Sequence, residues 1–159
     1  MKLFQLLTPE TIITNWPDTV SVKNKWKIIE YLVDLLVLNK NIPKDKKSEI
    51  IRLVKEREIS MTTGIGDGIA IPHASADFIE EETASMAVLP SGINFEAIDH
   101  KKVYIIVLVL IPKNDFQRHI RVLSGITRAL HYEDMIKTLL SAKNSKEALN
   151  IIKKNDEDY

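Results

Sequence analysis

The unbroken apolar run at residues 103–111 restricts the fold of this chain more than any other segment. It reads KVYIIVLVLIP from Lys102 to Pro112, is rich in Val and Ile, and lies between lysines and a proline. A half-exposed strand would alternate apolar and polar residues, so this run predicts a central strand buried on both faces. Helices on both faces of a sheet would bury such a strand. The run is far shorter than the roughly 20 residues that span a bilayer.

Two amphipathic helices are expected before this strand, over Lys25–Leu38 and Lys44–Glu58, with Asp45 or Ser48 capping the second. Their apolar residues recur at intervals of three and four, which is typical of a helix with one face on a core. The residues expected to face inward are Trp26, Ile29, Leu32, Val33 and Leu36 in the first helix, and Ile50, Ile51 and Val54 in the second.

Further elements complete a predicted α/β domain. Strands are expected at residues 69–71, stopped by Pro72, and at residues 84–90, with a short one at Thr19–Val22. A helix capped by Asp115 follows Pro112, and a last helix covers Ser145–Lys154. The inward stripe expected on the Asp115 helix is Phe116, Ile120, Leu123, Ile126 and Leu130. We therefore predict a single domain over residues 1–154, a mixed sheet flanked by helices on both faces (an α/β/α sandwich), followed by a charged tail at 155–159.

Composition excludes several classes of function. The 159 residues include 22 Lys+Arg and 22 Asp+Glu, so no overall positive field would attract nucleic acid or an anionic membrane. The absence of cysteine excludes disulfides and thiolate chemistry, and it fits a reducing compartment. The first residues have too short an apolar run for a signal peptide. We expect a soluble, cytoplasmic protein.

The stretch TTGIGDGIAIPHA, residues 62–74, holds three of the five glycines: Gly64, Gly66 and Gly68. It is not a dinucleotide fingerprint, because that motif needs GxGxxG opening a helix, and no Gly-Lys-Ser/Thr indicates a P-loop. Glycine permits positive φ, and successive backbone amides can form an anion-binding concavity to which Thr62 and Thr63 would add hydroxyl donors. Spacing alone leaves two alternatives open, a tight hairpin without a ligand and an anion cradle.

His73 follows this stretch and is the candidate for chemistry. Pro72 stiffens the approach and would hold the ring at the end of a strand, where sites in α/β sheets tend to lie. A neutral imidazole is nucleophilic and can carry a covalent group. Arg57 could clamp a phosphoryl group, and His119 lies in the first turn of the Asp115 helix, although each is also an ordinary surface or packing residue. His100 and His131 lie among charges and are assigned to the surface.

Three segments of the sequence resemble one protein family. EREISMTTGIGDGIAIPHA, LPSGINFEAIDHKKVYIIVLVLIP and DFQRHIRVLSGITRAL are similar to the fructose/mannitol-class (type-2) enzyme IIA domains of the bacterial phosphoenolpyruvate:sugar phosphotransferase system, over nearly the whole chain. The resemblance implies that His73 is phosphorylated, that Arg57 helps hold the phosphoryl group, and that His119 is the second histidine beside it. It implies a mixed sheet flanked by helices, and neither a metal nor an organic cofactor.

The resemblance also implies partners. Phosphoryl would pass from phospho-HPr to His73, with Arg57, the glycine-stretch amides and Thr62 or Thr63 neutralising its oxygens. Without fused IIB, IIC or HPr parts, the chain looks most like the nitrogen-regulatory IIA proteins, whose output is regulatory. The alternative is a stand-alone IIA subunit that passes phosphate to a IIB domain of a fructose- or mannitol-type permease, its only connection to a membrane. A binding module that is never phosphorylated is a third alternative, against which the joint presence of Arg57, His73 and His119 argues.

Overall fold

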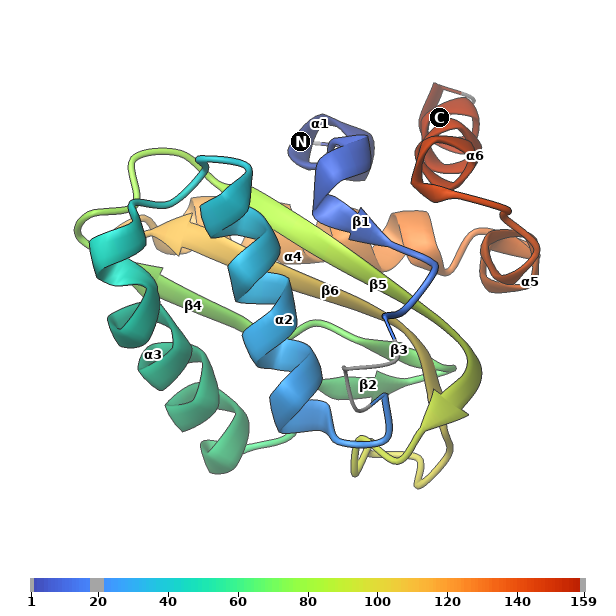
Figure 1. Cartoon of the computed structure of the whole chain (residues 1–159), viewed down its shortest axis with the longest axis horizontal. Helices are drawn as coiled ribbons and strands as arrows, with labels where there is room; N and C mark the ends of the chain where they lie inside the picture. The colour runs from blue at the N-terminus through green and yellow to red at the C-terminus, as the bar shows by residue number, and fades with distance from the viewer. Residues whose placement is uncertain (1, 18–21, 158–159) are drawn as a thin grey trace.

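Strand β6 (Val103–Pro112) lies at the centre of the sheet, which confirms the prediction made from its apolar run (Figure 1). The computed structural model describes residues 2–17 and 22–157. β6 pairs antiparallel with β5 (Thr83–Ile93) and parallel with both β3 (Ile69–Ala70) and β4 (His73–Ala76). β1 (Ile12–Ile13) pairs parallel with β5, and β2 (Gly64–Gly66) pairs antiparallel with β3. The sheet is therefore mixed, as expected.

Alternate side chains of β6 enter two separate hydrophobic cores. Ile105, Val107 and Val109 pack on one face of the sheet, whereas Ile106, Leu108 and Leu110 pack on the other. Successive side chains of a strand point to opposite faces, so a strand between two cores must be apolar at every position. The unbroken apolar run is the sequence consequence of this arrangement.

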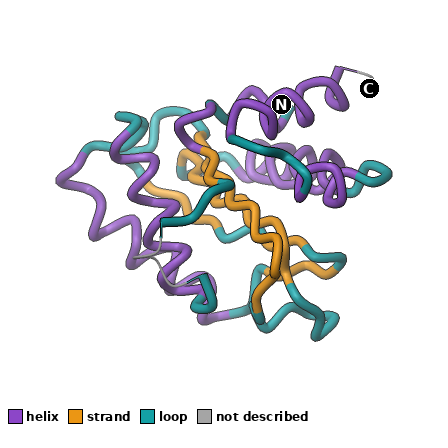
Figure 2. Tube along the Cα trace, turned by 45° about the vertical axis from the view of Figure 1, so that its right-hand side comes forward, coloured by secondary structure: helices purple, strands orange, loops and turns teal. Residues whose placement is uncertain are grey.

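Helices cover both faces, which confirms the α/β/α sandwich. α2 (Lys25–Leu38) and α3 (Lys47–Ser60) pack on the face that Ile106 enters. The opposite face is covered by α1 (Leu3–Leu6), α4 (Phe116–Leu130), α5 (Met135–Leu140) and α6 (Ser145–Glu157). Figure 2 shows the strands lying between these two groups of helices. Short 3-10 turns cover Pro9–Thr11 and Lys44–Lys46. The helices α1 and α5 were not expected, because so few residues show no helical period.

The start of α3 differs from the prediction. The expected helix at Lys44 divides into the 3-10 turn and α3, whose N-cap is Lys46 without a side-chain capping bond. The expectation that Asp45 or Ser48 caps this helix is therefore wrong. The first helix begins where expected, because the Asn24 side chain accepts hydrogen bonds from two backbone N–H groups of its first turn.

α4 begins as predicted but buries a different stripe. The Asp115 side chain caps it by accepting a 3.0 Å hydrogen bond from the Arg118 backbone N–H. Phe116 is 76% exposed and Ile120 is 50% exposed, so the prediction that they face the core is wrong. The buried residues of α4 begin two turns into the helix: Val122, Gly125, Ile126, Ala129 and Leu130. The first turns of α4 thus present apolar side chains outward.

The end of the chain packs more closely than its charge suggests. α6 runs to Glu157 instead of ending at Lys154, and Asp156 is buried. The Phe4 N–H donates a 3.2 Å hydrogen bond to the Asp156 carboxylate, and the Lys2 ammonium group donates to its backbone carbonyl. α1 and α6 accordingly lie side by side in Figure 1.

Two further expectations concern the N-terminal part and the membrane. Apart from Val22, the strand expected at Thr19–Val22 lies outside the described residues. Across the described part of the chain, no helix has both the length and the apolar character needed to cross a membrane.

Candidate functional site

His73 lies where the strand pairing with β6 is interrupted. β3 ends at Ala70, and β4 begins at His73, so the histidine starts a strand instead of following the end of one as expected. Pro72 still contributes its carbonyl, which accepts a 3.0 Å hydrogen bond from the Val109 N–H. This interruption holds the half-buried imidazole at a fixed position beside the central strand.

The His73 ring has two distinct nitrogens. Nδ1 lies 2.8 Å from the Ile71 backbone carbonyl oxygen. A carbonyl oxygen can only accept, so this contact assigns the proton of the neutral ring to Nδ1. Nε2 then carries the free lone pair. The contact therefore makes Nε2 the nucleophilic nitrogen.

The surroundings of His73 favour its neutral form. Burial is the largest influence and lowers the pKa of His73, while the hydrogen bond to Ile71 acts in the opposite direction. The charges of Arg57 and His119 lower this pKa as well, and that of Glu58 raises it. The net result is a pKa below the ordinary value of 6.5, so the ring is neutral at pH 7.

Arg57 approaches His73 from the last turn of α3. Its guanidinium donates a 2.7 Å hydrogen bond through Nη1 to the Met61 carbonyl oxygen just beyond the helix. This bond restrains the side chain near the point where the chain leaves α3, and it leaves other guanidinium donors for an anion.

His119 lies in the first turn of α4, and one of its ring nitrogens has no hydrogen-bond partner among the described residues. This atom, Nε2, is buried. An unpaired buried polar atom is costly, and a ligand oxygen would satisfy it. Arg57 and His119 both act electrostatically on His73, so α3, β4 and α4 each contribute one of these three side chains to the same neighbourhood.

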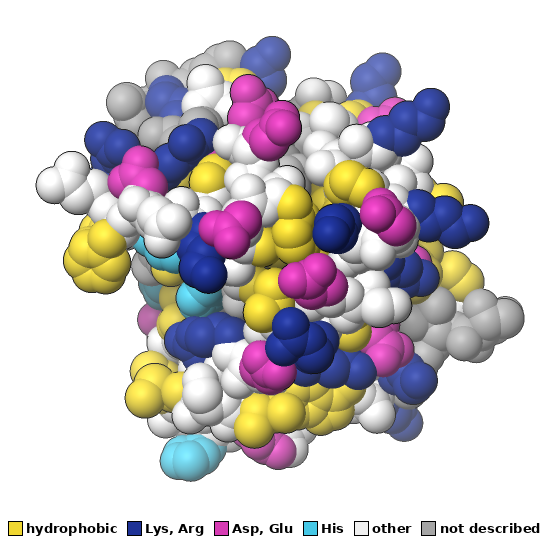
Figure 3. Space-filling view, turned by 90° about the vertical axis from the view of Figure 1, so that its left-hand side faces the viewer, with side chains coloured by type: hydrophobic (Ala, Val, Ile, Leu, Met, Phe, Trp, Pro, Cys, Tyr) yellow, Lys and Arg dark blue, Asp and Glu magenta, His cyan; other side chains and the backbone are white. Residues whose placement is uncertain are grey.

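The surface around these residues is mixed. Figure 3 shows histidine side chains among exposed hydrophobic and basic ones. Apolar side chains next to Arg57 and His119 in the sequence are largely exposed: Ile59, Met61, Phe116 and Ile120. Such side chains beside a small polar site are typical of a surface that contacts another protein.

Thr62 and Thr63 already use their hydroxyl groups within the protein. The Thr62 hydroxyl donates to the Phe95 carbonyl at 3.3 Å and accepts from the Gly64 N–H at 3.1 Å. The Thr63 hydroxyl donates to Glu58, and its backbone N–H donates to the same carboxylate. These bonds leave neither hydroxyl proton for a phosphoryl group, in contrast to the anion cradle considered from the sequence.

Glycines 64, 66 and 68 build a hairpin. Gly66 and Gly68 have φ of +95° and +81°, and a Cβ on Gly64 would lie 2.8 Å from Ala97. Gly68 accepts from Tyr104 N–H, whereas His73 pairs with Val109, roughly 16 Å further along β6 at about 3.3 Å per residue. Of the two alternatives, the structure therefore favours the hairpin for Gly66 and Gly68.

Glu58 and Lys25 form a buried pair that was not predicted from the sequence. Both are buried, and the Lys25 Nζ lies 3.1 Å from the Glu58 carboxylate. A signal was present, because Glu58 continues the buried stripe of Ile50 and Val54 at intervals of four residues. A charged residue on a core-facing stripe requires a partner.

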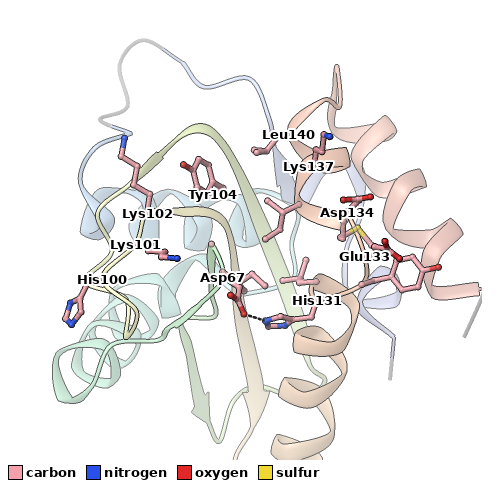
Figure 4. A pocket seen from close by; sticks show the side chains of 16 residues that line it. Asp67, His100, Lys101, Lys102, Tyr104, His131, Glu133, Asp134, Lys137 and Leu140 are labelled. Carbon is pink, nitrogen blue, oxygen red and sulfur yellow. Dashed lines mark hydrogen bonds and ion pairs between the residues drawn. The ribbon is translucent and has the colours of Figure 1, made fainter.

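A separate cleft of about 950 Å³ lies at the far end of β6 from His73. Figure 4 shows Tyr104 and the lysines beside it on one wall, and the segment from His131 to Leu140 on the other. His131 is exposed, as expected, and its Nε2 lies 3.2 Å from the Asp67 carboxylate. Gly68 lines this cleft, whereas His73, Arg57 and His119 do not.

The fold and the His73 site define a small α/β protein that presents a neutral imidazole nitrogen beside groups able to bind an anion. The family described as "Phosphoenolpyruvate-dependent sugar phosphotransferase system, EIIA 2" matches residues 5–155, and the chain belongs to this family. A relative from Haloferax volcanii, named PTS system fructose-specific EIIA component, is 33% identical over 124 residues, covering 78% of this chain and 79% of that protein.

Solved structures show the same fold. Nitrogen regulatory protein IIA-Ntr from Neisseria meningitidis superposes with a TM-score of 0.81 at 23% identity, covering 94% of this chain and 98% of that one. Enzyme IIAMTL from Escherichia coli, in complex with phosphorylated enzyme IIBMTL, has a TM-score of 0.76 at 20% identity, covering 93% and 97%. The family takes part in phosphotransfer, and sugar-specific and nitrogen-regulatory proteins share this fold.

Proposed function

We propose that this chain is a histidine phosphocarrier that accepts a phosphoryl group from a phospho-HPr-like donor on Nε2 of His73. The observation that carries the proposal is the contact between His73 Nδ1 and the Ile71 carbonyl, which leaves the Nε2 lone pair free. The buried, unpaired Nε2 of His119 supports it, because phosphoryl oxygens would supply the missing partner.

In the proposed reaction the Nε2 lone pair attacks phosphorus in line with the bond to the donor. The Nε2–P bond forms as the donor–P bond breaks, and the donor atom keeps that electron pair. No proton has to leave Nε2, because the neutral tautomer carries its proton on Nδ1. Phosphoryl transfer requires mainly positioning and charge stabilisation, which Arg57 and His119 supply. We assign Thr62, Thr63 and Gly64 to support of the loop, because both hydroxyl groups and the Thr63 and Gly64 N–H groups already have partners within the protein.

The test is phosphorylation from phosphoenolpyruvate with enzyme I and HPr. We expect acid-labile phosphate on the parent chain and none on His73→Ala. His100→Ala changes an exposed histidine outside the site and should behave as the parent. Uptake of phosphate by His73→Ala at the parental level would refute the assignment.

For the output of the phosphorylated protein, we propose regulatory binding of a partner, as in nitrogen-regulatory proteins. A relative from Pseudomonas aeruginosa named nitrogen regulatory protein, 26% identical over 152 residues, supports this output. The exposed apolar side chains beside the site, such as Phe116 and Met61, would form part of the contact with donor and target.

A second candidate output is transfer to a IIB domain, favoured by the relative named as a fructose-specific EIIA component. A purified fructose- or mannitol-type IIB protein separates the two outputs. Rapid transfer of phosphate from phosphorylated His73 to that protein supports sugar uptake, and its absence supports regulation.

A further inference from the structure

A chain of hydrogen bonds connects a buried ion pair to the imidazole of His73. The Lys25 ammonium contacts Glu58 at 3.1 Å, and the Glu58 carboxylate accepts from the Thr63 N–H at 3.1 Å. The Thr63 carbonyl in turn accepts from the Ile71 N–H at 3.0 Å, and the Ile71 carbonyl lies 2.8 Å from His73 Nδ1. The connection runs from α2 through α3 and the glycine hairpin to the start of β4.

Glu58 is the branch point of this chain. Its side chain is fully buried and has three kinds of donor: the Lys25 ammonium, the Thr63 backbone amide and the Thr63 hydroxyl. The residue also directly follows Arg57. The carboxylate therefore ties the end of α3, where Arg57 lies, to Thr63, whose carbonyl oxygen holds the Ile71 N–H.

The Lys25 ammonium group is held in place by further contacts. Its ammonium group donates to the Phe95 carbonyl at 3.2 Å and lies 4.9 Å from the centre of the Phe95 ring. The same carbonyl accepts from Thr62. A buried ion pair adds little net stability, because desolvation of two charges offsets their attraction. Stability alone therefore does not account for this buried pair beside the site.

We propose that Glu58, held by Lys25, is a positioning residue: through Thr63 and Ile71 it keeps the proton of His73 on Nδ1 and the Nε2 lone pair directed at the phosphoryl donor. Removing the carboxylate frees Thr63 and loosens the Ile71 carbonyl, so the tautomer with the proton on Nε2 becomes populated. That tautomer has no lone pair on the reacting atom. The effect on phosphoryl transfer rests on the proposed function, whereas the effect on the tautomer does not.

The first experiment compares Glu58→Gln with Glu56→Gln by nitrogen-15 NMR of the histidine rings. Glu56 is the matched control, because it lies in the same helix and pairs with Arg52 on the exposed face. We expect the parent and Glu56→Gln to hold the His73 proton on Nδ1, and Glu58→Gln to show a mixture of tautomers. Loss of the Glu58 charge should also lower the pKa of His73 further, because that carboxylate raises it.

The second experiment measures phosphorylation by phospho-HPr. The maximal rate should fall by about tenfold to a hundredfold in Glu58→Gln with little change in the donor KM, because a small misplacement of the attacking atom is sufficient for such a loss. In Glu58→Gln alone, the Lys25 ammonium group is left buried without its partner, which could unfold the protein. The double variant Lys25→Met/Glu58→Gln removes both charges and so avoids this problem. Circular dichroism checks that the double variant is folded. If the folded double variant keeps both the parental tautomer and the parental rate, the proposal is overturned.

The two arms separate this proposal from the proposed function. If the parent chain takes up no phosphate but Glu58→Gln still redistributes the His73 tautomers, the phosphocarrier function fails and the positioning role stands. If the parent is phosphorylated and Glu58→Gln keeps both its tautomer and its rate, the positioning role fails alone.

Discussion

At residue 73, burial and hydrogen bonding act on the imidazole in opposite directions. Burial and the electrostatic influence of Arg57 and His119 favour the neutral ring, while the Ile71 carbonyl and Glu58 favour the protonated one. Burial prevails, and the carbonyl still determines which nitrogen carries the single remaining proton. One side chain thereby receives both its charge state and its direction from neighbours.

The titration of His73 tests this balance. Its pKa in the folded protein should lie below the value of about 6.5 expected in the unfolded chain. Between these two pKa values the unfolded chain binds more protons than the folded one. The free energy of unfolding should therefore decrease as the pH falls from about 6.5 to the pKa of folded His73, and this contribution should stay constant at lower pH. NMR of the His73 ring in buffer and in urea measures both values. A folded pKa equal to or above the unfolded one would contradict the prediction.

At the scale of elements, the start of α4 was predicted correctly, but the face that it turns to the core was not. Asp115 caps it as the sequence indicates, because a cap bond is formed within one turn. The choice of buried stripe depends on what lies under the helix. The buried residues of this helix begin at Val122, so Phe116 and Ile120 are left exposed on either side of His119 in the sequence.

Removal of this cap should destabilise the protein measurably. We expect Asp115→Ala to lower the free energy of unfolding by about 1 kcal/mol, the usual contribution of a cap bond. Asp45→Ala provides the control, because Asp45 is an exposed aspartate near a helix start that makes no capping bond, and it should change the value by less than about 0.5 kcal/mol. Urea denaturation measures both. Equal effects of the two substitutions would argue against the cap.

At the scale of the whole molecule, β6 belongs to both cores. Its side chains alternate between the layer containing α2 and α3 and the layer containing α4, α5 and α6. The strand therefore connects the elements that hold Arg57 and His119, and β4 pairs with it at His73. The geometry of the site depends on this shared strand.

A cavity in β6 should consequently affect the entire fold. Leu108 is fully buried, and Leu108→Ala should lower the free energy of unfolding by about 2–5 kcal/mol. Leu38 is 78% exposed, so Leu38→Ala should cost less than about 0.5 kcal/mol. Thermal and urea unfolding followed by circular dichroism should show one transition at a reduced midpoint for Leu108→Ala. A reduction no larger than that of Leu38→Ala would contradict the central role of β6.

The features predicted correctly from the sequence are those that depend on residues close together in the chain. The helix at Lys25–Leu38, the Asp115 cap and the doubly buried strand follow from period, capping chemistry and apolar continuity. The end of α6 was misjudged, because burial of Asp156 depends on α1, at the opposite end of the chain. The joint importance of Arg57, His73 and His119 came from a resemblance, since spacing alone left each a plausible surface residue.

By itself, the sequence determined the α/β/α class and the central strand, because periodicity and apolar continuity are properties of neighbouring positions. Its resemblance to a family is what pointed to Arg57, His73 and His119. Only the tertiary structure decided that Gly66 and Gly68 form a hairpin turn, that Thr62 and Thr63 are engaged, and that Nε2 of His73 is the free nitrogen. It also revealed the buried pair of Lys25 and Glu58. These outcomes depend on hydrogen bonds between elements distant in the chain, and the relative placement of such elements is set by packing.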